Sequence, residues 1–321
     1  MRYRTLGDNG PAVSVVGLGC YTFGRQLDLA GTRRVVGAAL ESGVTLVDTA
    51  DVYGSTLSEQ FLGSALGKRR GEVVLATKFG QTADLGYGTD AGPKGGARYI
   101  RRAIEGSLRR LGTDYIDLYQ MHVPDLTVPI DETLACLDGL VRAGMVRYIG
   151  CSNFNAEQLR EAAIVAADDG YVSFVSAQNH WSLLRREPES ELVPTAVGLG
   201  LGVLPYFPLA NGLLTGKVRS DGAVAPGTRL AAHPHWLTER NLATVAALTR
   251  WASVRGRTLL DVAVGGLLAR PGCASVITGA TSAAQIKANA AAAGWLPSAA
   301  ELGELDEIAP SIQRAKAPVE G

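Results

Sequence analysis

The stretch VRYIGCSNFNAEQL (146–159) contains the unit from which the predicted fold is built. Its first seven residues, Val146–Ser152, form a short and largely apolar segment, as expected of a parallel strand that is buried on both faces. Asn155 and Gln158 then have the spacing of a capping box, which predicts that a helix begins directly after the strand. The stretch is therefore interpreted as one β/α unit.

Seven further segments have the same character: Val13–Gly19, Val44–Ala50, Val73–Phe79, Ile116–His122, Phe174–Asn179, Leu201–Phe207 and Ser275–Gly279. Most are separated by about thirty residues, the length of one β/α unit. Helical patterns such as Thr32–Ser42 and Thr258–Ala269 fill the intervals, and Ser58 is placed to cap a helix that runs to Gly67. Eight repeats predict an α/β fold that closes into a (β/α)8 TIM barrel, although periodicity alone also permits an open, doubly wound sheet.

Two features lie outside the repeat. Tyr3–Leu6 and Ala12–Val16 flank the turn Gly7-Asp8-Asn9-Gly10, which predicts an N-terminal β-hairpin that plugs the N-terminal end of the barrel. The turn-rich stretch Ala210–Pro234 predicts a long loop after strand seven, on the face where the active site of such a barrel forms. No internal boundary interrupts the pattern, so residues 1–321 are interpreted as a single barrel domain.

The composition narrows the class of partner. Apolar residues make up 46% of the chain, and 31 basic residues balance 31 acidic ones, so nothing favours nucleic acid or an anionic membrane as a partner. The N-terminal sequence has no apolar signal region, and no apolar run approaches the roughly 20 residues that span a bilayer. Four cysteines without CxxC spacing predict buried, reduced thiols. We therefore expect a cytoplasmic protein.

Polar residues stand at the C-terminal ends of the predicted strands. Asp48 ends the second strand, Tyr53 follows in its loop, Lys78 ends the third strand and His122 ends the fourth. Taken singly, such an Asp is more often a cap or ion-pair partner, and such a His is more often a core residue. Lys and Asp are almost never buried unpaired, so their joint placement on neighbouring strand ends favours one shared site.

These four side chains suit the reduction of a carbonyl. A free Tyr has a pKa of about 10, and a neighbouring ammonium lowers that pKa. Lys78 supplies the charge, Asp48 holds Lys78 as its ion-pair partner, and His122 donates a hydrogen bond to the carbonyl oxygen or to the Tyr53 hydroxyl. Together they polarise a carbonyl and protonate the alkoxide that forms as hydride arrives, and no metal is required.

The motifs around these residues resemble those of the aldo-keto reductases. The matching segments, in the family's order, are DTADVYG (48–54), TKFG (77–80), DLYQMHVPD (117–125), GMVRYIGCSNF (144–154), GLLTGK (212–217) and VITGATSAAQIKANAAA (276–292). The RYRTLG opening and the long loop after strand seven are most similar to bacterial members and to potassium-channel beta subunits. The resemblance implies an NADP-dependent enzyme that reduces an aldehyde or ketone, sugar-like substrates included. Its general acid would be Tyr53, modulated by Lys78 and Asp48, with His122 orienting the substrate.

The resemblance also implies a set of cofactor contacts. Three polar residues would bind the nicotinamide carboxamide, an aromatic ring would stack on the nicotinamide, and two groups would follow the diphosphate and the adenosine. In that order the residues are Ser152, Asn153 and Gln178; Tyr206; Pro208, Leu209, Gly212, Leu214, Gly216 and Lys217; and Gly279, Thr281, Ser282, Gln285 and Asn289. Ser282 and Gln285 have capping-box spacing in their own right, which places a helix N-terminus, suited to a phosphate, after strand eight.

The adenosine end departs from the pattern of many eukaryotic members. Gly279 and Gln285 stand where those members carry the Lys and Arg that hold the 2′-phosphate, and Thr278 stands where a Pro is common. NADP is still expected in preference to NAD. Arg229, in the long loop, is the candidate for the missing cation, with an ordinary exposed Arg as the alternative. Gly17-Leu18-Gly19 matches a dinucleotide fingerprint only weakly, because Thr22 occupies the third glycine position.

Two other functions use the same residues. A Schiff-base lyase would need Lys78 as a free amine, which the neighbouring Asp48 and Tyr53 disfavour. A cofactor-sensing regulatory subunit is allowed by the channel-beta resemblance, and an intact catalytic set does not distinguish it from an enzyme. The pattern assigns neither a particular carbonyl substrate nor an oligomeric state. Loops 80–98 and 210–235 shape the predicted substrate pocket, and its candidate lining residues, with core packing as the alternative, are Tyr21, Phe23, Trp181 and Trp236.

Overall fold

The computed structural model describes residues 1–81, 85–88, 90–218, 224 and 228–311. In this part of the chain, eight parallel strands form a closed barrel in the order β10-β3-β4-β5-β6-β7-β8-β9. The strands are β3 (Val16–Gly19), β4 (Leu46–Asp48), β5 (Val74–Phe79), β6 (Ile116–Met121), β7 (Val146–Ser152), β8 (Phe174–His180), β9 (Gly202–Tyr206) and β10 (Val276–Gly279). The predicted (β/α)8 barrel is therefore confirmed.

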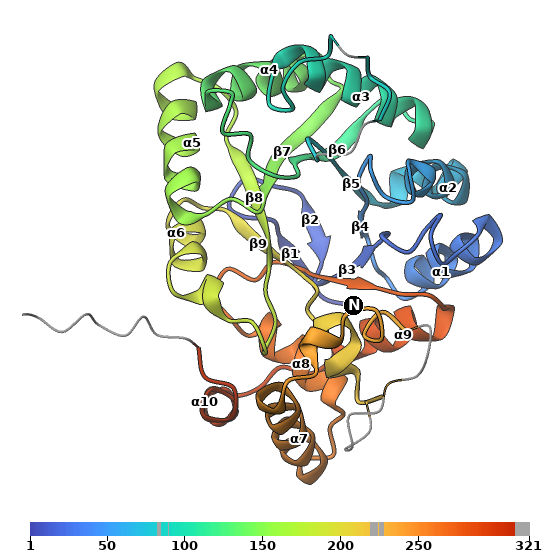
Figure 1. Cartoon of the computed structure of the whole chain (residues 1–321), viewed down its shortest axis with the longest axis vertical. Helices are drawn as coiled ribbons and strands as arrows, with labels where there is room; N and C mark the ends of the chain where they lie inside the picture. The colour runs from blue at the N-terminus through green and yellow to red at the C-terminus, as the bar shows by residue number, and fades with distance from the viewer. Residues whose placement is uncertain (82–84, 89, 219–223, 225–227, 312–321) are drawn as a thin grey trace, which may run out of the picture.

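Helices surround the barrel, as Figure 1 shows. They are α1 (Leu29–Glu41), α2 (Leu57–Leu66), α3 (Ala97–Leu111), α4 (Ile130–Arg142), α5 (Ala156–Asp169), α6 (Leu192–Gly198), α7 (Glu239–Val254), α8 (Leu259–Leu268), α9 (Ala283–Ala292) and α10 (Ala299–Ile308), with short 3-10 turns η1 (Gly67–Glu72), η2 (Glu187–Glu189), η3 (Ala210–Thr215) and η4 (Pro234–Trp236). The capping box of Asn155 and Gln158 is present at the start of α5. None of the described helices has the length and apolar character needed to cross a membrane.

The N-terminal hairpin closes one end of the barrel. Strands β1 (Tyr3–Thr5) and β2 (Ala12–Ser14) pair antiparallel and lie within the ring of strands in Figure 1. Leu6 and Val13 are fully buried against the barrel interior, and the Asp8 amide donates to the Gly200 carbonyl just before β9 begins. The hairpin thus plugs the N-terminal end, as predicted.

Three local predictions are corrected by the structure. The segment Val13–Gly19 is not one strand, because the chain bends at Ser14, whose hydroxyl donates to the Val16 carbonyl at 2.7 Å, and only the second part joins the barrel. Ser58 does not cap α2, which begins at Leu57. The buried Ser58 hydroxyl instead donates to the Cys20 carbonyl at 2.9 Å. Gln285 does not complete a capping box with Ser282, because its side-chain oxygen accepts from Thr281.

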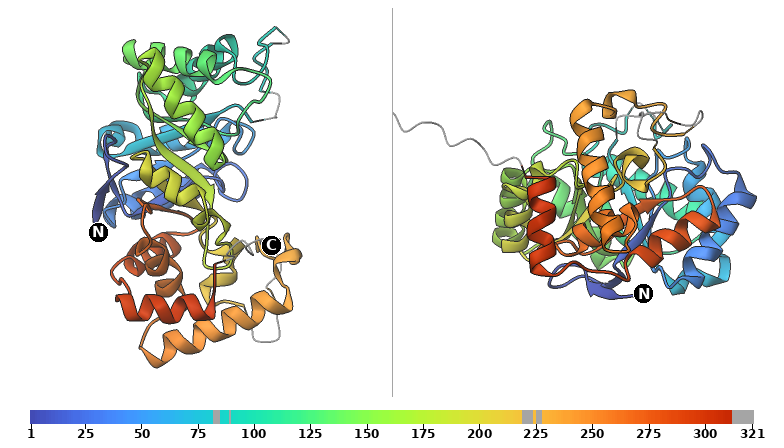
Figure 2. Two further views of the ribbon diagram at one scale, coloured as in Figure 1. Left: turned by 90° about the vertical axis from the view of Figure 1, so that its left-hand side faces the viewer. Right: turned by 90° about the horizontal axis from the view of Figure 1, so that it is seen from below.

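The C-terminal third of the chain adds structure that the repeat does not predict. Helices α7 and α10 lie together with α8 and α9 beside the barrel, as the two views of Figure 2 show. The predicted loop 210–235 begins with η3, but its residues 219–223 and 225–227 lie outside the described residues, as do 82–84 and 89 of the loop 80–98. All four cysteines are buried free thiols, as predicted.

Candidate active site

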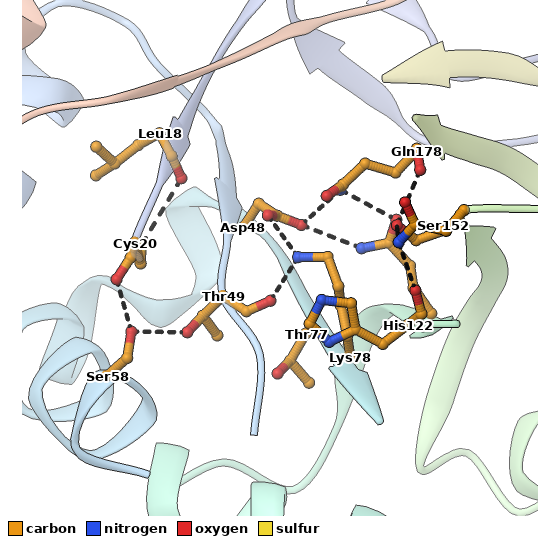
Figure 3. A network of polar contacts seen from close by, with 12 residues as sticks. Leu18, Cys20, Asp48, Thr49, Ser58, Thr77, Lys78, His122, Ser152 and Gln178 are labelled. Carbon is orange, nitrogen blue, oxygen red and sulfur yellow. Dashed lines mark hydrogen bonds and ion pairs between the residues drawn. The ribbon is translucent and has the colours of Figure 1, made fainter. Parts of the chain in front are cut away.

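A buried ion pair lies at the C-terminal end of the barrel, where β4 and β5 end. The Lys78 ammonium donates to Asp48 Oδ2 at 2.6 Å and to the Thr49 carbonyl at 2.8 Å. The other carboxylate oxygen of Asp48 accepts from the Gln120 amide at 3.1 Å and from the Gln178 amide at 2.9 Å. In Figure 3 the Lys78 side chain reaches Asp48 from below and the Gln178 side chain reaches it from the upper right. Both oxygens of this buried carboxylate are therefore satisfied.

This pairing keeps Lys78 charged. Burial, the largest single cause, lowers the pKa of Lys78, but the charge and hydrogen bond of Asp48 together with nearby Tyr53 and Cys20 outweigh it, so that the pKa is raised overall. Lys78 is fully buried. A buried ammonium with a fixed partner is a localised positive charge at the floor of the site.

Tyr53 lies above this charge. The Lys78 nitrogen is 5.3 Å from the centre of the Tyr53 ring, and the His122 ring meets the Tyr53 ring edge to face at 5.8 Å. Gly54 follows Tyr53 with φ of 57°, and a Cβ there would lie 2.6 Å from the Phe23 carbonyl oxygen, so only glycine fits this turn. The structure thus brings together the four predicted catalytic residues, Asp48, Tyr53, Lys78 and His122.

The expected direction of the Tyr53 pKa is corrected. Burial raises the pKa of Tyr53 by more than the neighbouring Lys78 charge lowers it, so the hydroxyl is protonated at neutral pH. The sequence indicates which charges lie near Tyr53, but it does not show how far burial removes the ring from water, and this burial raises the pKa. A protonated Tyr53 is in the state that an acid requires.

His122 is a neutral hydrogen-bonding group. Burial, and secondarily the Lys78 charge, lower the pKa of His122 to about 3. Its backbone is fixed, because its amide donates to the Phe79 carbonyl at 2.7 Å and its carbonyl accepts from the Asn153 side chain at 2.9 Å. Its Nδ1 is enclosed by protein and has no hydrogen-bond partner among the described residues. His122 lines the cavity, so a hydrogen bond from its ring to a ligand there would involve Nε2.

The predicted carboxamide contacts form a connected rim. The Ser152 hydroxyl donates to the Gln178 carbonyl at 2.8 Å, and the Tyr206 hydroxyl donates to Asn153 Oδ1 at 2.7 Å. Asn153 has φ of 63°, a left-handed conformation that Asn tolerates better than most residues. These contacts bring the ends of β7, β8 and β9 to one edge of the site.

A cavity of about 930 Å³ extends from this site across the ends of β9 and β10. Most of the predicted site residues line it: Tyr21, Asp48, Tyr53, His122, Ser152, Asn153, Gln178, Tyr206, Pro208, Leu209, Gly212, Lys217, Arg229, Gly279, Thr281, Ser282, Gln285 and Asn289. The N-terminus of α9 opens into the cavity through Ser282, whose hydroxyl accepts from the Gln285 amide. One cavity therefore joins the candidate catalytic residues to a helix N-terminus.

Six predicted site residues do not line this cavity, and one of them, Lys78, is fully buried behind it, paired with Asp48. Phe23 and Trp181 are fully buried in the main core, and the Trp181 indole donates to Glu189 at 2.9 Å. Leu214 is buried with the residues that pack beneath η3, and Gly216 ends that turn with φ of 75°. Trp236 packs on the His180 ring at 5.6 Å. Phe23 and Trp181 therefore pack in the core, the alternative that the sequence left open, whereas Trp236 is half-buried.

The structure adds Gln120 to the residues around Asp48. It is fully buried in β6, two residues before His122. Residues at i and i+2 of a strand share one face. A polar amide within a buried strand, two residues before a predicted catalytic His, could therefore have been predicted to face the same site.

Asp51 is a second addition, and it lies behind the Tyr53 loop. The side chain is fully buried, and among the described residues only the Val52 backbone N–H approaches its carboxylate, without forming a well-aligned hydrogen bond. Nearby Glu59 already binds Thr77 and Arg110, each at 2.6 Å. Burial and the negative charge of Glu59 raise the pKa of Asp51 to about 7. Asp51 is therefore largely protonated in the folded protein below neutral pH.

We expect this carboxyl to make stability depend on pH. The folded protein keeps the proton while the unfolded chain releases it, so the free energy of unfolding should fall as pH rises from 3.8 to about 7. Asp51→Asn should flatten this slope and stabilise the protein at pH 8 by on the order of 1–3 kcal/mol. Urea unfolding across this pH range measures the effect, with exposed Asp168→Asn as control. Equal slopes for the parent and Asp51→Asn would contradict it.

Comparison with known proteins agrees with this arrangement. A model of the aldo/keto reductase family matches residues 15–310. The chain is 35% identical over 309 residues to a probable voltage-gated potassium channel subunit beta of Oryza sativa subsp. japonica, which covers 92% of each chain. It is 37% identical to the uncharacterized oxidoreductase YrpG of Bacillus subtilis, over 89% of each chain. It is 34% identical to the aldo-keto reductase YhdN of the same bacterium, over 96% of this chain and 93% of the relative.

The family match extends over the barrel strands and the residues that converge on the buried Lys78–Asp48 pair. Fold, site and relatives therefore lead to one assignment: this chain belongs to the aldo/keto reductase family and is an oxidoreductase.

Proposed function

We propose that this protein is an NADP-dependent reductase that converts an aldehyde or ketone to an alcohol, with Tyr53 as the general acid. The observation that carries the proposal is the buried Lys78–Asp48 pair, at 2.6 Å, placed beneath Tyr53 at the wall of the large cavity. The family generally uses NAD(P)H and acts on small-molecule carbonyls. Sugar-like carbonyls are included in the proposal.

The residues support the proton half of this reaction. When bound, reduced nicotinamide supplies a hydride to the carbonyl carbon, which leaves negative charge on the oxygen. Tyr53 is protonated at neutral pH and can pass its proton to that oxygen. The Lys78 ammonium stabilises the phenolate that remains, and Asp48 keeps the ammonium in place. Neutral His122 can orient the carbonyl through a hydrogen bond.

The cavity fits a dinucleotide with a phosphate end. Ser152, Asn153 and Gln178 offer amide and hydroxyl groups near the catalytic residues, and Tyr206 offers a ring. At the other end, the N-terminus of α9 presents Ser282 to the cavity, and helix N-termini favour phosphates. Arg229 also lines the cavity, and its Nε has no hydrogen-bond partner among the described residues. We assign these groups to the carboxamide, the nicotinamide ring and the phosphates.

We expect NADPH to bind more tightly than NADH, with Arg229 contributing to the difference. The Arg229 guanidinium packs on the Tyr21 ring at 4.4 Å and on the Phe207 ring at 4.2 Å, which holds it at the cavity wall on the side of Tyr53, so its contact with the 2′-phosphate is what the titration tests. Arg229→Ala should weaken NADPH by about 1–3 kcal/mol, the cost of a lost charged hydrogen bond, and leave NADH unchanged. Fluorescence titration with both cofactors measures this, with exposed Arg250→Ala as control. Equal affinity of the parent for both cofactors would remove the 2′-phosphate assignment.

A cofactor-sensing regulatory subunit is the second candidate. The observation that favours it is the 35% identity to a probable potassium channel subunit beta. Both functions predict NADPH binding, so oxidation of bound NADPH with a panel of aldehydes and ketones separates them. Turnover of a member of the panel supports the reductase, and tight binding without turnover of any of them supports the sensor. A Schiff-base lyase is disfavoured, because the Lys78 amine is held by Asp48 and the Thr49 carbonyl.

A further inference from the structure

The two faces of the Tyr206 ring have different surroundings. Tyr206 ends β9 and lines the cavity. His180 lies beside it in register on β8, and the two rings stack with centres 5.3 Å apart and planes 29° apart. His180 is not part of the cavity wall. The imidazole therefore backs the Tyr206 ring on the side away from the cavity.

The position of both rings is fixed by further contacts. The Tyr206 hydroxyl donates to Asn153 at 2.7 Å, which anchors the far edge of the ring. Phe207 meets Tyr206 edge to face at 5.0 Å and His180 edge to face at 5.3 Å. Trp236 covers His180 with ring centres 5.6 Å apart. The half-buried imidazole thus contacts three aromatic rings.

The chemistry of His180 indicates a stacking role. Burial, with the charges of Arg185 and Arg229, lowers the pKa of His180 to about 4, so the ring is neutral at neutral pH. Its Nε2 has no hydrogen-bond partner among the described residues. An oxidised nicotinamide is cationic, and a positive charge on His180 behind Tyr206 would repel it. A neutral imidazole avoids this repulsion.

We propose that His180 is a positioning residue for the nicotinamide: it backs Tyr206 so that the cavity-facing side of that ring forms a flat platform for the cofactor. The inference rests on the proposed function, in which Tyr206 stacks on the nicotinamide. Removing the imidazole leaves a space into which Tyr206 can tilt, and offset stacking depends on the ring plane. The loss should fall on the nicotinamide half of the cofactor and spare the adenosine half.

The test compares two ligands in His180→Ala. NADPH carries the nicotinamide, and 2′-phospho-ADP-ribose lacks it. Loss of one stacked aromatic contact should weaken NADPH about 3- to 10-fold, while 2′-phospho-ADP-ribose binds as in the parent. His180→Phe keeps a flat neutral ring and should recover most of the NADPH affinity. Tyr3→Ala, which removes an exposed ring from the hairpin at the opposite end of the barrel, is the control.

Three results would overturn the role of His180: unchanged NADPH affinity in His180→Ala, equal weakening of both ligands, or no recovery in His180→Phe. The second of these would mean that His180 only supports the fold. Failure of the proposed function gives a different result, because the parent itself would then bind NADPH no better than 2′-phospho-ADP-ribose, or would not bind NADPH. The parent titrations are therefore read first.

Discussion

Tyr53→Phe is expected to reduce kcat/KM for a carbonyl substrate by about 10²- to 10⁴-fold, the range for loss of a general acid. The substitution keeps the ring and its edge-to-face contacts with Tyr21 at 5.2 Å and His122 at 5.8 Å, so only the proton source is removed. NADPH affinity should barely change, because the assigned carboxamide contacts come from other strands. Steady-state kinetics and cofactor titration measure the two effects.

Tyr3→Phe is the matched control, because it removes an exposed hydroxyl from the hairpin at the opposite end of the barrel. It should leave both kcat/KM and NADPH affinity at the parent values. A comparable loss in the two variants would show that the Tyr53 hydroxyl has no special role.

Lys78→Met is expected to affect both rate and stability. Lys78 is fully buried, and its removal leaves the Asp48 carboxylate without its counter-charge, which costs about 3–5 kcal/mol for a buried pair. The rate should fall by at least about 10²-fold, because no charge then stabilises the Tyr53 phenolate. Combining Lys78→Met with Tyr53→Phe should cost little more than the worse single change, since the two residues act as a unit.

The Asp48→Asn/Lys78→Met double variant separates the two effects. It removes the unpaired charge, so much of the free energy of unfolding lost in Lys78→Met should return while the rate stays low. Urea unfolding measures the free energy of unfolding and steady-state kinetics measure kcat on the same preparations, with exposed Lys68→Met as control. A double variant as unstable as Lys78→Met would show that the ion pair is not what the substitution disrupts.

Much of the fold was readable because its signals are local. Each signal involves only residues that are close in sequence: the strand and helix patterns, the Asn155–Gln158 capping box and the hairpin turn. The structure contains all of these elements. The convergence of the four candidate catalytic residues could be predicted because parallel strands bring their C-terminal ends to one rim. Asp48 and Lys78 are 30 residues apart in the chain but 2.6 Å apart in space for this reason.

The incorrect predictions concern side chains whose partners are set by tertiary packing. Serine is a common helix-capping residue, but the Ser58 hydroxyl forms hydrogen bonds in the core, to the Cys20 carbonyl and the Thr49 hydroxyl. Gln285 has capping-box spacing, but its side-chain oxygen accepts from the Thr281 amide instead of the Ser282 amide. Phe23 and Trp181 have the size of pocket residues, and whether such rings face a cavity or the core depends on how loops pack.

The pKa of Tyr53 shows the same limit for electrostatics. Sequence spacing predicts that Lys78 lies nearby, and it does, at 5.3 Å from the ring. The competing cost of burial depends on every neighbour at once and appears only when the barrel is assembled. Asp51 is a further case, because no pattern in DTADVYG indicates that its carboxyl is left unpaired.

The most direct test of the account is single-turnover hydride transfer, followed by the loss of absorbance of bound NADPH after a carbonyl substrate is mixed with the loaded protein. The parent is expected to oxidise one equivalent of NADPH, and Tyr53→Phe to do so at least about 10²-fold more slowly with unchanged cofactor binding. Transfer by Tyr53→Phe at near the parent rate would mean that the proton has another source. That result would contradict the role of Tyr53 proposed here.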